Sequence, residues 1–130
     1  MSRDRAAVGP SGEKLPARFL LRGKKEFDEV YNKGTPYRGR YTVLVALFSA
    51  GFSERKVGFV AGKRVGNAVK RNRVRRLMKE AFRRAQPEMI SVPGRMVFIA
   101  RSAGAEAGYY EIERDIRGLL AQASLLKEAG

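Results

Sequence analysis

The stretch that decides the fold, residues 62–84, reads GKRVGNAVKRNRVRRLMKEAFRR. Apolar side chains recur in its second half at helical spacing, so at about 100° per residue they share one face. This apolar stripe consists of Val74, Leu77, Met78, Ala81, Phe82 and Ala85. The amide oxygen of Asn67 is suited to cap the first turn, and Pro87 limits the helix at its other end. We therefore predict an amphipathic helix that packs its stripe against a core.

Positive charge is concentrated in the same part of the chain. Residues 56–84 hold eleven Lys or Arg and one acid, Glu80, which gives this segment +10 of a formal net charge of +14. Like charges three or four residues apart on a helix repel one another, and a polyanion relieves that repulsion. We therefore predict that the polar face, with Asn72, Arg76, Lys79 and Arg83, binds nucleic acid. A solvated basic helix without a partner is the alternative.

Composition excludes several classes of protein. The 130 residues provide for one domain, and the absence of cysteine excludes disulfides and thiolate metal sites. The chain also lacks histidine, the commonest general base and metal ligand. No acids converge in the sequence, so we predict neither catalytic residues nor metal ligands. No apolar run approaches the roughly 18 residues of a membrane span, and no signal peptide is recognisable, so we expect a cytoplasmic protein.

The N-terminal third indicates a tail, a helix and the first strands. Residues 1–14 are polar and rich in Gly, Pro and Ser, which predicts a disordered tail before a single domain over residues 15–127. Residues 24–32 predict a short helix with Phe27, Val30 and Tyr31 on one face and Gly34 as its stop signal. The simplest interpretation of Phe27 and Tyr31 is core packing.

The strands are predicted from alternation and from apolar runs. Residues 35–37 indicate an edge strand, and residues 41–48 alternate with Tyr41, Val43, Val45 and Leu47 on one face. Because another strand follows at residues 56–61, we predict an antiparallel hairpin over residues 41–61. Residues 96–100 form a continuous apolar run, typical of a fully buried strand.

A closing helix is predicted from residue 109 to about residue 127. We interpret its acids, Glu111, Glu113 and Asp115, as ordinary surface charges. The order of elements indicates an α+β sandwich with one mixed sheet. General statistics predict a right-handed crossover from residues 56–61 through the basic helix to residues 96–100.

A longer string around the basic helix resembles a known family. Residues 58–83, GFVAGKRVGNAVKRNRVRRLMKEAFR, closely resemble the signature of the bacterial ribonuclease P protein component. Leu15-Pro16, residues 26–31, Gly34, residues 41–47 and residues 97–101 agree in order and spacing, so the resemblance covers roughly residues 15 to 123. It implies a small α/β sandwich of three helices and one mixed four-stranded sheet, in the order α-β-β-β-α-β-α. It also implies a left-handed crossover, against the general rule.

The resemblance further implies a function. A protein of this family is the cofactor of a catalytic RNA that removes the 5′ leader of precursor tRNA, and the RNA holds most of the Mg²⁺. The implied contacts to that RNA are Lys63, Arg64, Asn67, Lys70, Arg71, Asn72, Arg73, Arg75, Arg76 and Lys79. The implied groove for the single-stranded leader is lined by Phe27, Tyr31, Arg40, Val43 and Val45, which leaves core packing and leader contact as alternatives for the two aromatic residues.

Two other classes of protein remain as alternatives. Basic helices on small α/β folds also occur in ribosomal-type RNA-binding proteins that have no catalytic partner. Binding to an anionic membrane surface would need bulky apolar residues free to insert. Because the stripe of the basic helix is predicted to be buried in the core, we do not expect a membrane partner.

Overall fold

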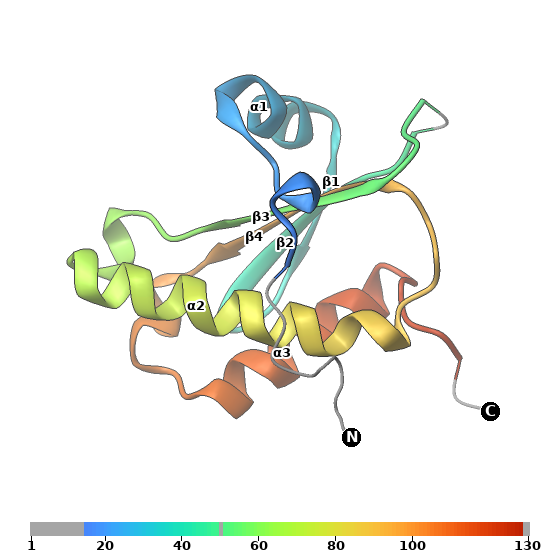
Figure 1. Ribbon diagram of the computed structural model, residues 1–130. Coiled ribbons are helices and arrows are strands. Elements are labelled where there is room, and N and C mark those ends of the chain that lie inside the picture. The colour runs from blue at the N-terminus through green and yellow to red at the C-terminus, as the bar shows by residue number, and fades with distance from the viewer. Residues whose placement is uncertain (1–14, 50, 129–130) are drawn as a thin grey trace.

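One four-stranded sheet with helices on both faces forms the framework of the computed structural model, which describes residues 15–49 and 51–128. Figure 1 shows α1 on one side of the sheet and α2 and α3 on the other. The predicted tail, residues 1–14, lies outside the described residues. In chain order the elements are α1 (Gly23–Lys33), β1 (Thr35–Arg38), β2 (Thr42–Leu47), β3 (Arg55–Val60), α2 (Ala68–Ala85), β4 (Gly94–Ala100) and α3 (Tyr109–Gln122).

The strand order is β1-β2-β4-β3, so the predicted hairpin between β2 and β3 is wrong. β4 lies between them, antiparallel to β2 and parallel to β3. Val97 and Phe98 of β4 are both fully buried, one on each face of the sheet, and such a strand is most stable in the centre. The mixed four-stranded sheet is confirmed, with β1 as the predicted edge strand. The left-handed crossover implied for β3, α2 and β4 stays a prediction.

The larger core lies between the sheet and the pair α2 and α3. The predicted stripe of α2 is buried there except for Leu77, which is half-buried against the same cluster. Three aromatic rings meet at its centre, with Phe59 and Phe98 stacked at 5.9 Å between centroids and Phe82 at 5.6 Å from Phe98. Burying such a side chain contributes about 1.5–3 kcal/mol. The packing of α2 therefore commits its apolar face and leaves its basic face outside.

The smaller core lies beneath α1, and the side chains of β2 alternate between this core and the larger one, as predicted. Val45 is buried and Val43 half-buried against Val30 of α1, whereas Leu44 belongs to the larger core. Tyr41 departs from the prediction, because β2 begins only at Thr42 and the Tyr41 side chain packs against the larger core.

Asp115 is not an ordinary surface charge, so that interpretation is wrong. Its Oδ2 accepts hydrogen bonds from the Tyr41 and Thr42 amides at 3.0 and 2.8 Å and from Thr42 Oγ1 at 2.7 Å. Its Oδ1 accepts from the Arg40 amide at 3.0 Å. A Cβ at Gly39 would lie 2.6 Å from this carboxylate, so a glycine is required there. Asp115 thus fastens α3 to the turn that starts β2.

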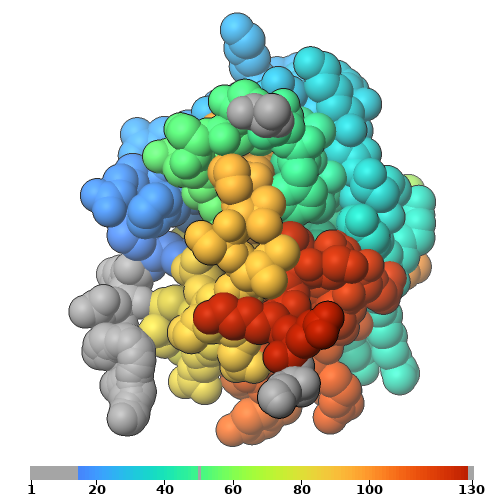
Figure 2. Space-filling model, turned by 90° about the vertical axis from the view of Figure 1, so that its right-hand side faces the viewer, coloured from blue at the N-terminus to red at the C-terminus, as the bar shows by residue number. Residues whose placement is uncertain are grey.

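The last helix ends earlier than predicted. α3 stops at Gln122, Ser124 adopts a positive φ of 60°, and the Leu125 amide donates to the Leu120 carbonyl at 2.8 Å. Figure 2 shows the following residues, in red, against the segment after α2, in orange, where the Ile90 amide donates to the Leu125 carbonyl at 2.8 Å. No helix in the described ranges is both long and apolar enough to cross a membrane.

Candidate nucleic-acid interface

The start of α2 presents the first group of predicted RNA contacts. Asn67 Oδ1 accepts from the Lys70 amide at 3.0 Å, which confirms the predicted cap. A 3-10 turn over Lys63–Val65 precedes the helix and buries only Val65. The remaining side chains of this group are therefore exposed together at one end of α2, and they are Lys63, Arg64, Asn67 and Lys70.

Further along α2, the polar face divides into two parts. Asn72, Arg76 and Lys79 are exposed, as predicted for the RNA-binding face. Near the helix end, Arg83 and Arg84 instead bind Glu80 at 2.6 and 2.9 Å. Hydrogen bonding from Arg83, more than the charges nearby, lowers the pKa of Glu80 below its ordinary value. The positive charge at this end of α2 is therefore partly neutralised within the protein.

Arg71 and Arg73, two of the predicted phosphate contacts, are half-buried, and within the part of the protein that the structure describes only Arg73 of this pair is hydrogen-bonded. Arg73 is half-buried and donates to the Ala107 carbonyl at 2.7 Å and to the Ala105 carbonyl at 3.3 Å, which ties α2 to the segment before α3. Arg71 is also half-buried, and its Nε is buried without a hydrogen-bond partner among the described residues. The charge pattern alone does not separate these two arginines from the exposed ones.

Four of the five residues predicted for the leader groove meet on the α1 face of the sheet. Val43 and Phe27 pack around buried Val45, and the rings of Phe27 and Tyr31 lie 6.3 Å apart. Tyr31 is 43% exposed, and partial burial raises the pKa of its hydroxyl. The fifth residue, Arg40, lies elsewhere.

Arg40 lies beside α3, where its backbone amide donates to Asp115 at 3.0 Å. Its guanidinium carbon lies 5.3 Å from the ring centre of Tyr41, a residue of the larger core on the opposite face of the sheet. The structure therefore separates Arg40 from the other four residues of the predicted leader groove.

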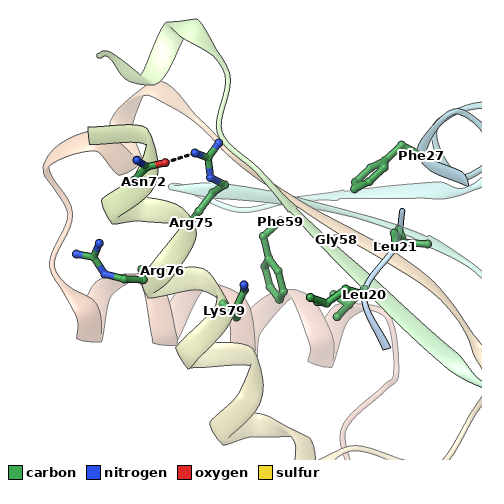
Figure 3. Close-up of a pocket in the computed structure, with 10 residues that line it drawn as sticks. Leu20, Leu21, Phe27, Gly58, Phe59, Asn72, Arg75, Arg76 and Lys79 are labelled. Carbon is green, nitrogen blue, oxygen red and sulfur yellow. Dashed lines mark hydrogen bonds between the residues drawn. The ribbon is translucent and has the colours of Figure 1, made fainter. Parts of the chain in front are cut away.

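A groove that sequence reasoning missed opens beside β3, at the edge of the sheet. It has a volume of about 500 Å³ and joins residues of α2, β3, α1 and the segment before α1 (Figure 3). Leu20 enters it from that leading segment, where no periodicity indicates a site. The lining residues are Leu20, Leu21, Phe27, Val57, Gly58, Phe59, Asn72, Arg75, Arg76 and Lys79.

Comparison with known proteins agrees with this geometry. The family model described as Ribonuclease P matches residues 15–124. The chain belongs to the ribonuclease P protein family. The ribonuclease P protein component of Clostridioides difficile is 37% identical over 100 residues, which are 77% of this chain and 87% of that protein. The corresponding protein of Bacillus velezensis is 31% identical over 115 residues, 88% of this chain and 97% of that protein.

Solved structures of this family share the fold. The Staphylococcus aureus RNase P protein aligns with a TM-score of 0.74 at 21% identity and covers 84% of this chain and 98% of its own. The Thermotoga maritima RNase P protein aligns with a TM-score of 0.65 at 21% identity and covers 85% and 96%. The resemblance seen in residues 58–83 and the small α+β fold are therefore confirmed. The family makes the chain a protein component of an endoribonuclease that takes part in tRNA processing.

Proposed function

We propose that this chain assists a catalytic RNA in removing the 5′ leader of precursor tRNA and binds both molecules. Family membership supports this role, and the observation that carries it is the basic face of α2. On that helix no acid precedes Glu80, and exposed cations continue from the 3-10 turn at residues 63–65 along the helix. Such a surface binds phosphates and releases their counterions, so its affinity for RNA is strongly dependent on salt.

The chemistry of leader removal is proposed to belong to the RNA. Among the residues that the structure describes, no three His, Cys, Asp or Glu side chains gather where they could hold a metal ion. The Mg²⁺ needed for hydrolysis would then be held mainly by RNA phosphates. By neutralising some of those phosphates, the cations of α2 lower the Mg²⁺ concentration at which the RNA is folded and active. The reaction fits a cytoplasmic setting.

The leader is proposed to bind on the α1 face of the sheet. Phe27 and Tyr31 present aromatic rings there, and Val43 adds apolar surface beside them. Aromatic faces suit a single strand of variable sequence, because every base can stack on a ring. Since mature tRNA has no leader, these contacts would favour precursor over product.

The deciding experiment measures precursor-tRNA cleavage at low Mg²⁺ with a bacterial ribonuclease P RNA, with and without the protein. We expect cleavage when both components are present and none with protein alone. Tight RNA binding without a gain in cleavage would instead favour an RNA-binding protein of the ribosomal type. Cleavage by the protein alone would contradict the assignment of the chemistry to the RNA.

A further inference from the structure

We propose that the groove beside β3 receives an unpaired nucleotide of the RNA partner, with its base against Phe59 and Leu20 and its phosphate at Lys79 and Arg75. The inference rests on the proposed function, because it assumes that an RNA docks on α2. It adds a concave site to a surface that otherwise makes phosphate contacts along a convex helix. The site shares the Phe27 ring with the aromatic surface assigned to the leader and extends from that ring toward α2.

The apolar part of the groove is held rigidly. Leu20 pairs with Val57 of β3 in an isolated parallel β-bridge, and the Leu21 amide donates to the Val57 carbonyl at 3.0 Å. The Phe59 ring stacks on Phe98 with 10° between their planes and meets Phe82 edge-on at 5.9 Å. A ring fixed from behind in this way loses little freedom when a base packs against its open side. The groove thus provides a preformed platform for stacking.

The opposite wall of the groove is basic. Arg75, Arg76 and Lys79 stand on neighbouring turns of α2, and no acid lines the groove among the residues that the structure describes. Figure 3 shows Lys79 on the side of α2 that faces Phe59 and Leu20. An apolar floor beneath cations matches the two halves of a nucleotide, its base and its phosphate. The volume of about 500 Å³ also falls within the range of about 300–1,000 Å³ usual for small-molecule sites.

The geometry favours the RNA docked on α2 over the leader as the source of this nucleotide. The Phe27 ring lies over Gly58, where an added Cβ would be 2.5 Å from the ring, so this ring stands between the groove and Tyr31. The cations of the groove also belong to the same face of α2 as the predicted RNA contacts. An RNA on that face reaches the groove directly, whereas the leader would have to pass Phe27.

The absence of cysteine from the chain allows a direct test. Leu20→Cys introduces one thiol in the groove, and a bulky maleimide on that thiol occupies the space of the base without changing a charge. Ser91→Cys, in the exposed loop after α2, is the matched control. The affinity for a bacterial ribonuclease P RNA is measured without precursor tRNA, so that no leader takes part. Thermal unfolding checks that each modified protein is folded.

We expect modification of Leu20→Cys to weaken RNA binding about tenfold, the effect of losing roughly one stacked base. Modification of Ser91→Cys should leave the affinity unchanged. Equal affinity before and after modification of Leu20→Cys would overturn the proposal. If Leu20→Cys does not fold, Phe59→Leu replaces it, because this change removes the ring on which the base stacks without changing a charge, and the same loss of RNA affinity is expected.

Two further results separate this inference from the proposed function. A modified Leu20→Cys that keeps its RNA affinity but loses its preference for precursor over mature tRNA would assign the groove to the leader, which overturns the proposal. If the unmodified protein neither binds the RNA nor stimulates cleavage, the proposed function itself fails. If it does both and modification changes nothing, only the nucleotide site fails.

Discussion

Replacing Asp115 with alanine should destabilise the protein far more than its position on an outer helix suggests. The carboxylate accepts four hydrogen bonds from three consecutive residues, Arg40, Tyr41 and Thr42. Thr42 is fully buried, so neither its amide nor its hydroxyl can turn to water once the carboxylate is removed. The same turn leads directly into β2, which carries Val43 of the proposed leader surface.

The magnitude follows from which donors lose their partner. Leaving a buried donor unsatisfied costs about 1–3 kcal/mol, and Thr42 contributes two such donors. The amide of Arg40 lies at an exposed position, where water can replace the carboxylate at a cost of about 0.5–1.5 kcal/mol. We therefore expect Asp115→Ala to lower the free energy of unfolding by about 3–5 kcal/mol.

Urea unfolding followed by circular dichroism measures this loss. For a small protein the expected change moves the midpoint by about 2 M. Arg114→Ala, at the exposed neighbouring position, is the control and should change stability by less than about 0.5 kcal/mol. An Asp115→Ala midpoint within error of the Arg114→Ala midpoint would refute the argument that this carboxylate anchors β2.

Four more predictions concern the basic helix and the aromatic surface. Arg73→Ala should lower the free energy of unfolding by about 1.5–3 kcal/mol, because two carbonyls lose a charged donor, and it should also weaken RNA docking. Arg76→Ala should weaken RNA docking alone. Urea unfolding measures the stability of both variants, and filter binding measures their affinity for the RNA. Tyr31→Ala should reduce the ratio of precursor to mature tRNA affinity without unfolding the protein, since the side chain is 43% exposed; unfolding would favour plain core packing. The stability contributed by Glu80 should be complete above its ordinary pKa of 4.5 and disappear as pH falls through its lowered folded-state pKa. The unfolding free energies of Glu80→Gln and the parent protein, measured over this acid range, should therefore converge as the pH falls. For roughly six phosphate contacts, the log–log salt dependence of RNA affinity should have a slope of about −4, and a slope near zero would contradict electrostatic docking.

The helices could be predicted because their signals are local. The stripe from Val74 to Ala85 specifies which face of α2 is buried, and Asn67 marks its start at the position that the structure shows. The strand order could not be predicted in the same way, since alternation describes the faces of β2 and β3 but not their neighbours. The predicted hairpin failed because β4, distant in sequence, lies between the two strands and pairs with both.

The candidate site was predictable as a charged face but not in its details. Sequence spacing brings the arginines of α2 together, yet only tertiary contacts show that Arg73 is bound to carbonyls of another segment. The same holds for Asp115, whose partners lie more than seventy positions away along the chain. The groove beside β3 combines Leu20, Phe59 and Lys79 from three separate elements, and no single stretch of sequence contains its pattern.

The central position of β4 also sets an order of events during synthesis and folding. β2 and β3 emerge from the ribosome first, but each needs the same later strand, and Thr42 finds its partner only when Ala100 has been made. Until then the stripe of α2 has no complete sheet to cover. Such distant pairings slow folding, because the closure of a long loop precedes any gain from contact. The nascent chain therefore carries its positive charge fully exposed before its core can close, and a chain that ends before Gly94 has two strands without their common partner.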